Sequence, residues 1–159
     1  MDTSRSTPTR SAPRHLWVVG VLSLIWNSIG AFDYLMTQTR NEAYMGQFTP
    51  EQLAYFYGFP SWVVATWALA VWGGVLGSVL LLLRQPLAAP VFGVSLVTMV
   101  VTTVYNFVLT DGVAVMGAGG AVFSAVIFGI AVALYVYARR LVRTGGLSGA
   151  SVGAFGVRS

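Results

Sequence analysis

The side chains of this chain that could do chemistry are a few polar groups set within long apolar stretches. Asp33 is the most informative of them, because an ionisable group inside an apolar segment is costly to bury and is often functional. A buried carboxyl group there would suit a proton or cation carrier. Asp33 also lies near the polar end of its segment, where water or Arg40 would reach it. A solvated or paired interfacial carboxylate is therefore the alternative interpretation.

Amide, hydroxyl and aromatic groups accompany Asp33 in the apolar segments. Amide and carboxyl groups can bind the hydroxyl groups of a sugar-like solute, while aromatic rings stack on its apolar faces. Asn27 also fits a second role, since amide side chains often form hydrogen bonds between transmembrane helices. The candidate ligand-binding set comprises Trp26, Asn27, Asp33, Tyr34, Trp62, Thr66, Thr102 and Asn106.

Catalytic and metal-binding constellations are absent from the sequence. The chain has no cysteine and a single histidine, His15, at the edge of the first apolar segment. A haem b site would need histidines within the segments, and no Ser/His or His/Glu cluster is present for hydrolysis or metal catalysis. The sequence therefore predicts a protein that is not an enzyme and that holds neither a metal nor a cofactor.

Four apolar segments must position these side chains, at about residues 16–36, 61–83, 88–109 and 115–138. Each is near the ~20 residues that a helix needs to cross a hydrocarbon core of ~30 Å. Backbone polar groups in lipid must bond within the segment, which predicts helices. With 56% hydrophobic and 9% charged residues, the composition is that of an all-α integral membrane protein. Residues 15–140 form the predicted transmembrane domain, between a disordered tail (1–14) and a flexible, Gly- and Ser-rich tail (141–159).

The basic side chains are all arginines, and they gather on one side of the four segments. Arg14 precedes the first segment and Arg84 separates the second from the third. Arg139 and Arg140 follow the fourth, and Arg40 is the exception. Since cytoplasmic flanks retain arginine during insertion, both termini are predicted to be cytoplasmic. The exclusive use of arginine, with many Ala, Gly and Val residues, indicates a GC-rich genome and hence the bacterial inner membrane. Membrane lipids are expected partners, because juxtamembrane arginines attract anionic headgroups, and nucleic acid is not.

The first connection, residues 37–60, is long enough to hold structure of its own. Thr49-Pro50-Glu51-Gln52 has the form of a capping box, followed by a short helix to Tyr57 and by Gly58 as a left-handed terminator. Aromatic residues crowd this stretch, and aromatic rings prefer the membrane interface. The sequence therefore predicts a short interfacial helix in the first outer loop, either as an aromatic anchor or as a lid over an outward-facing opening.

Small residues at helical spacing mark the faces on which the four segments would pack. Gly73 and Gly77 form a GxxxG pair, and Gly30 and Gly129 allow close approach in the first and fourth segments. An average spacing of about 3.5 residues predicts a compact antiparallel four-helix bundle with unbroken helices. The polar groups fall in its outer half, above an apolar inner half.

These residues carry a resemblance to a known family. The relevant motifs are Trp26-Asn27-x-x-Gly30, Asp33-Tyr34-x-Met36-Thr37, Pro60-Ser61-Trp62, Gly73-Gly74-x-x-Gly77 and Leu80 to Arg84. Across roughly residues 15–140 the chain resembles a family of small bacterial four-helix membrane proteins that often carry the label "sugar transporter". The resemblance supplies no catalytic residues, and it implies functional weight on Trp26, Asn27, Asp33, Tyr34 and Trp62.

Two functions fit these features. One is binding or transport of a small polar solute through an outward-facing site. Four unbroken helices would make a thin wall, so a transporter would need a homo-oligomer or a larger membrane complex. The other is a non-catalytic accessory, structural or sensor subunit, which requires only the topology, the aromatic loop and the packing faces.

Overall fold

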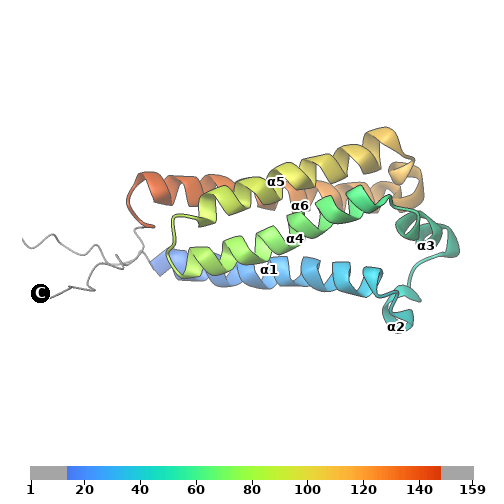
Figure 1. Cartoon of the computed structure of the whole chain (residues 1–159), viewed down its shortest axis with the longest axis horizontal. Coiled ribbons are helices and arrows are strands. Elements are labelled where there is room, and N and C mark those ends of the chain that lie inside the picture. Colours follow the sequence, from blue (N-terminus) through green and yellow to red (C-terminus); the bar gives the residue numbers. More distant parts are fainter. Residues whose placement is uncertain (1–13, 148–159) are drawn as a thin grey trace, which may run out of the picture.

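The computed structural model describes residues 14–147, which form helices joined by turns (Figure 1). The elements in chain order are α1 (Arg14–Gln38), α2 (Glu42–Met45), α3 (Pro50–Tyr57), α4 (Ser61–Leu82), α5 (Ala88–Val104), the π-helix η1 (Tyr105–Leu109) and α6 (Gly112–Arg143). No strand occurs within the described range. Residues 1–13 and 148–159, which include most of the two predicted tails, lie outside it.

Four helical segments are long and apolar enough to cross a membrane, as the sequence predicts. They are α1, α4, α5 together with η1, and α6. The predicted second and third segments agree with Ser61–Leu82 and Ala88–Leu109 almost to the residue. Helices α1 and α6 are longer than predicted, because polar residues at their ends continue the helix.

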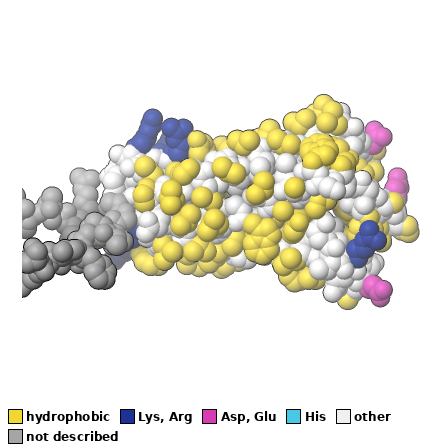
Figure 2. Space-filling model, viewed as in Figure 1, with side chains coloured by type: hydrophobic (Ala, Val, Ile, Leu, Met, Phe, Trp, Pro, Cys, Tyr) yellow, Lys and Arg dark blue, Asp and Glu magenta, His cyan; other side chains and the backbone are white. Residues whose placement is uncertain are grey.

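The two ends of the bundle differ in their charged side chains (Figure 2). At one end lie the start of α1, the α4–α5 turn and the last turn of α6. We call this the arginine end, and its basic residues are Arg14, Arg84, Arg139, Arg140 and Arg143. The opposite end, the α3 end, holds α2, α3 and the α5–α6 turn. The acidic residues of the described chain lie in or next to the elements near this end: Asp33, Glu42, Glu51 and Asp111. Arg40 also lies here, over the Tyr57 ring of α3.

Helix α4 lies between α1 and α5 and contacts both (Figure 1). Near the arginine end, Gly20 of α1 lies against Leu82 of α4. Toward the α3 end, the ring of Tyr34 packs edge to face on Trp67, with 5.0 Å between the ring centroids. Residues that come later in α1 therefore contact residues that come earlier in α4.

Glycines allow α4 to approach α5 closely. A Cβ atom at Gly77 would lie 2.8 Å from the Phe92 ring, and one at Gly73 would lie 3.1 Å from the Ser95 side chain. Buried Ser95 also donates a hydrogen bond of 2.5 Å from Oγ to the carbonyl oxygen of Ala70. The GxxxG face is therefore used inside the bundle, against α5.

Gly30 and Gly129 are not points of tight approach within this chain, in contrast to the prediction. A Cβ atom at Gly30 would make an ordinary contact at 3.9 Å from Val71. One at Gly129 would meet no atom within 4 Å, and the residue is exposed on α6. Tight approach involves Gly20 of α1 and Gly74 and Gly77 of α4 instead.

The apolar core lies toward the arginine end. Its buried members are Leu16, Leu81, Ala88, Ala89, Phe92, Leu134, Ala138, Leu141 and Leu147. Leu16 thus brings the first helix into the same cluster as the end of α6, and Nδ1 of His15 lies 2.7 Å from the hydroxyl oxygen of Tyr137. Between Gly112 and Leu134, α6 has no fully buried residue. Packing is therefore tighter at the arginine end than along the rest of α6.

Two breaks interrupt the helices near the α3 end, so the prediction of unbroken helices is wrong. The π-helix η1 follows α5 directly. Gly117, with φ 68° and ψ 180°, separates the first turn of α6 from the remainder, in a conformation that glycine adopts readily. Gly58 also differs from prediction, because its φ of −82° is right-handed. It ends α3 by donating its backbone N–H to the carbonyl oxygen of Ala54.

Candidate functional site

The structure divides the candidate ligand-binding residues among several places. Asn27 lies on the face of α1 that packs against α4. Its Nδ2 atom donates to the carbonyl oxygen of Ser23 over 2.8 Å and to Oγ of Ser78 over 3.2 Å. The two serine hydroxyl groups are 2.6 Å apart and buried, and a Cβ atom at Gly74 would collide with Oδ1 of Asn27. Asn27 therefore connects two helices, which is the second of the roles considered for it.

The carboxylate of Asp33 joins α1 to α2. The hydroxyl group of Tyr44 donates to its Oδ1 atom over 2.7 Å. Burial of the phenol, this hydrogen bond and the negative charge of Asp33 raise the pKa of Tyr44 to about 12. The guanidinium group of Arg40 lies elsewhere, 4.5 Å from the centroid of the Tyr57 ring. Asp33 is thus a paired carboxylate, with Tyr44 as its partner.

The aromatic candidates contribute ring contacts. Tyr34 packs on Trp67, as described above. Trp62 is about half exposed and meets the Tyr105 ring with 5.3 Å between centroids. Trp26 is partly buried on α1. Tyr34 and Trp62 are connected through the rings of Trp67, Phe59 and Tyr105, whereas Asn27 bonds to Ser23 and Ser78.

Three candidates, Thr66, Thr102 and Asn106, come together between α4 and α5. Oγ1 of Thr102 donates to Oγ1 of Thr66 over 3.2 Å, and Nδ2 of Asn106 donates to the Thr102 carbonyl oxygen over 2.8 Å. Thr110 continues the row, because its Oγ1 donates to the Asn106 carbonyl oxygen over 3.2 Å. We call Thr66, Thr102, Asn106 and Thr110 the polar seam. It ends at α3.

Tyr55 of α3 completes the seam, and the sequence-based set does not contain it. Its hydroxyl group donates to Oδ1 of Asn106 over 2.8 Å and lies 2.7 Å from Oγ1 of Thr110. Burial raises the pKa of Tyr55, whereas the bond to Thr110 acts in the opposite direction. In the sequence Tyr55 is one of several aromatic residues in the first connection, and its partners lie 51 and 55 residues away. Local patterns could not have identified this pairing.

A capping box positions α3, as the sequence predicts. Oγ1 of Thr49 accepts from the backbone N–H of Gln52, and Oε1 of Gln52 accepts from the N–H of Thr49. Nε2 of Gln52 also donates to the Val115 carbonyl oxygen of α6 over 3.3 Å. Because residues three apart on a helix share a face, Gln52 and Tyr55 point to the same side of α3. That side contacts the region where α5 ends and α6 begins.

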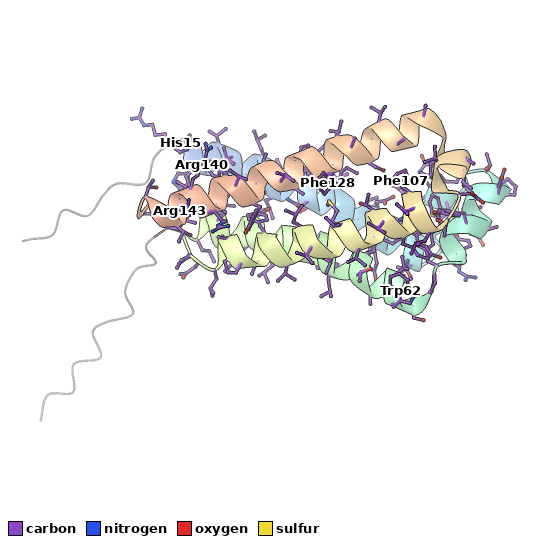
Figure 3. The ribbon with its side chains drawn as sticks, turned by 90° about the horizontal axis from the view of Figure 1, so that it is seen from above. His15, Trp62, Phe107, Phe128, Arg140 and Arg143 are labelled. Carbon is purple, nitrogen blue, oxygen red and sulfur yellow. The ribbon has the colours of Figure 1, made fainter. Side chains whose placement is uncertain are left out.

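Aromatic rings surround Tyr55 at the α3 end. Phe59 is central to them, with centroid distances of 5.1 Å to Tyr55, 5.7 Å to Tyr105 and 6.3 Å to Trp67. The rings meet edge to face, a geometry worth about 0.5–1.5 kcal/mol per pair. Figure 3 shows Trp62 at this end of the bundle, far from His15 and Arg143. The seam therefore adjoins an aromatic cluster.

The seam also lies where regular helix ends. Asn106 belongs to η1, and the carbonyl oxygen of Tyr105 is a second acceptor within reach of the single Thr110 hydroxyl proton, at 3.0 Å. Turns of π-helix occur frequently at functional sites. A Cβ atom at Gly112 would lie 2.8 Å from the Tyr55 hydroxyl oxygen and would collide with the Asn106 carbonyl oxygen. Glycine at this position therefore lets the α5–α6 turn fit against α3.

The groups of the seam suit hydrogen bonding to a neutral ligand. They are hydroxyl groups and one amide, which can each donate and accept. In the part of the chain that the structure describes, no three His, Cys, Asp or Glu side chains lie together as a metal site would need.

No protein-family model, curated protein or solved structure matches this chain. The fold and the composition of the chain therefore define only a broad class of protein. Four helices long and apolar enough to cross a membrane are consistent with a small multi-pass membrane protein.

Proposed function

We propose that the chain is a multi-pass protein of the bacterial inner membrane that binds a small polar, sugar-like solute at the α3 end. Both termini lie in the cytoplasm, and the antiparallel bundle presents α3 at the outer interface. The arginine distribution supports this orientation, because five of the six described arginines lie at the arginine end and Arg40 lies at the other.

The position of the Tyr55 hydroxyl group supports solute binding most directly. It lies between the amide oxygen of Asn106, at 2.8 Å, and the hydroxyl group of Thr110, at 2.7 Å. A sugar hydroxyl group donates and accepts hydrogen bonds in the same way as a phenol. The rings of Phe59 and Tyr105 lie close by and offer apolar faces for stacking. The seam thus has the groups that a hydroxyl-rich neutral solute requires.

The neighbouring helix breaks favour the same place. Ligand sites in membrane proteins are commonly built where helices are interrupted, and η1 and Gly117 are such interruptions. The resemblance to small proteins labelled "sugar transporter" points to the same class of ligand. Movement of a solute across the whole bundle would meet the apolar core at the arginine end. Transport would therefore involve a homo-oligomer or a larger membrane complex.

Calorimetric titration in lipid nanodiscs tests solute binding. The protein is titrated with a panel of monosaccharides, disaccharides and polyols. Asn106→Ala removes the amide that faces Tyr55 and is expected to weaken binding about tenfold, the equivalent of ~1.4 kcal/mol. Thr98→Val is the matched control on α5, because the Thr98 hydroxyl group bonds to carbonyl oxygens of its own helix. No binding across the panel, or equal affinities in the two variants, would contradict the proposal.

Asp33→Asn provides a second control, since Asp33 is bonded to Tyr44 outside the seam. It is expected to leave the affinity within about twofold of the unchanged protein. The same variants in a proteoliposome uptake assay show whether binding leads to transport. Uptake that fails with Asp33→Asn while binding persists would identify Asp33 as a coupling residue rather than a ligand contact.

A second candidate function is that of a non-catalytic accessory, structural or sensor subunit. Its support is the exposed length of α6 and an open, mostly apolar face of α1 formed by Leu24, Ile25, Ser28, Ile29 and Phe32. In a membrane, lipid or helices of another protein cover such surfaces. Crosslinking in native membranes followed by mass spectrometry tests this function. A stoichiometric partner, together with no solute binding, would favour the subunit over the solute-binding protein.

A further inference from the structure

We infer that α3 is a lid on the polar seam. The Tyr55 hydroxyl group holds the lid shut, and it occupies the position that a solute hydroxyl group takes when the lid opens. The inference of a lid is based on the contacts that α3 makes. The exchange of one hydroxyl group for the other rests on the proposed solute binding.

In the observed state the polar groups of the seam form hydrogen bonds with other groups of the same chain. Oδ1 of Asn106 accepts from Tyr55, and Nδ2 of Asn106 donates to Thr102. The Thr110 hydroxyl group lies within hydrogen-bond distance of Tyr55 as well. A solute hydroxyl group can therefore take the position between Asn106 and Thr110 only if the Tyr55 hydroxyl group leaves it. The observed state is closed by one side chain of α3.

Helix α3 is attached in a way that permits it to move. None of its residues is fully buried, and Gly58 follows it directly. Its polar attachments to the rest of the bundle are made by Tyr55 and by Gln52, which donates to the Val115 carbonyl oxygen. Segments with few buried contacts open at lower free energy than the core of the same protein. Helix α3 has this character, whereas the core at the arginine end does not.

Gly117 is placed to act as the hinge on the other side of the seam. The first turn of α6, Gly112–Met116, carries both the Val115 carbonyl oxygen bound by Gln52 and the Gly112 backbone against Tyr55. Gly117 has non-helical torsion angles, and a Cβ atom there would meet nothing within 4 Å. Hinges are commonly a few such residues at the ends of elements. This turn is therefore free to move with α3 while the remainder of α6 stays in place.

In this arrangement closing of the lid and solute binding compete for the same position, beside Asn106 and Thr110. Removing the Tyr55 hydroxyl group would raise the fraction of open molecules. Because apparent affinity scales with the fraction of molecules that can bind, a solute should bind more tightly to Tyr55→Phe. If the Tyr55 hydroxyl group were instead a contact to the solute, its removal would weaken solute binding. The direction of the change therefore separates a lid from an ordinary binding residue.

Thiol labelling in nanodiscs tests the lid without any solute. The natural chain has no cysteine, so single substitutions give clean reporters. Thr102→Cys places a thiol in the seam, and Ser78→Cys places one in the buried contact between α1 and α4. Each is exposed to a hydrophilic maleimide, alone and combined with Tyr55→Phe or Tyr57→Phe. Tyr57→Phe is the matched control, because Tyr57 is on the same helix and meets Arg40 through its ring.

The expected result is labelling at Thr102→Cys about fivefold or more faster with Tyr55→Phe, and unchanged with Tyr57→Phe. Ser78→Cys should stay protected in every background. Equal rates with the two tyrosine variants would overturn the lid. Labelling of Ser78→Cys in the Tyr55→Phe background would overturn it too, because the hydroxyl group would then support the whole bundle. Calorimetry on Tyr55→Phe tests the exchange: tighter solute binding supports it, and equal or weaker binding overturns it while the lid stands.

Discussion

The hydroxyl group of Tyr55 lies 2.8 Å from the amide oxygen of Asn106, joining a helix of the first long connection to the π-helix that follows α5. Helix α3 has no fully buried residue of its own. Its place on the bundle therefore depends on a few directed contacts and on the rings around Phe59. The hydrogen bond between Tyr55 and Asn106 thus connects α3, on the surface, to the part of the bundle where the helices are irregular.

Asn27→Ala is expected to loosen α1 from α4 without affecting the seam. The substitution removes the donor to Ser23 and Ser78 and leaves a void beside Gly74. The free energy of unfolding should fall by about 1–3 kcal/mol, measured by SDS titration in mixed micelles. Ser28→Ala, on the exposed side of α1, should change it by less than about 0.5 kcal/mol. Loss of solute binding at unchanged stability would assign Asn27 a ligand role instead.

The bond between Tyr44 and Asp33 should make stability depend on alkaline pH. The pKa of Tyr44 in the folded protein, about 12, is above its ordinary value of 10.0, so folding favours the protonated phenol. Its contribution is fully present below pH 10 and is lost as the pH rises through 10 toward 12. Tyr44→Phe removes this titration, while Tyr55, whose pKa is also raised, titrates in both proteins.

The measurement is the difference in unfolding midpoint between the unchanged protein and Tyr44→Phe across this range. The difference should be constant near neutral pH and shrink above pH 10. A difference that stays constant up to pH 12 would exclude the Tyr44 phenol as its source.

Gly77→Ala and Gly129→Ala should differ sharply, although both replace a glycine in a membrane-length helix. A Cβ atom at position 77 would lie 2.8 Å from the Phe92 ring, whereas one at position 129 meets nothing within 4 Å. Overpacking at Gly77 should lower the free energy of unfolding by about 1–3 kcal/mol. Gly129→Ala should be neutral or slightly stabilising, because alanine favours helix. Destabilisation by Gly129→Ala in the membrane but not in detergent would reveal an intermolecular contact at that face.

Reporter fusions test the proposed orientation. Alkaline phosphatase inserted between Glu42 and Tyr57 should be active, because that connection is expected outside the cytoplasm. Green fluorescent protein fused after Arg143 should fluoresce, since the arginine end is expected inside. The opposite pattern at either position would reverse or reject the arrangement.

Much of the fold could be predicted from the sequence because lipid restricts it so strongly. Apolar length alone located the four helices, and Ser61–Leu82 matches its predicted bounds closely. The capping box at Thr49 was readable because its two hydrogen bonds join residues three apart. Helical spacing also brought Thr102 and Asn106 onto one face, where the structure places them together.

The remaining features depend on partners that are distant in sequence. The role of Tyr55 requires Asn106, 51 residues later, and nothing local distinguishes it from the neighbouring aromatic residues. The π-helix carries no sequence pattern of its own, and Gly117 looks like any glycine in an apolar segment. Asn27 fitted two roles, and its contact with Ser78 of another helix, 51 residues away, carries no local sequence signal.

The meeting of α1 and α6 at the arginine end gives the bundle an order of assembly. His15 and Tyr137, which are 122 residues apart, lie in contact there, and Leu16 shares a buried cluster with Leu134 and Leu141. This cluster cannot close until α6 has been synthesised. A nascent chain that stops after α5 would leave Leu16 and Phe92 without Leu134 and Leu141 beside them. Helix α6 thus completes the core that α1 begins.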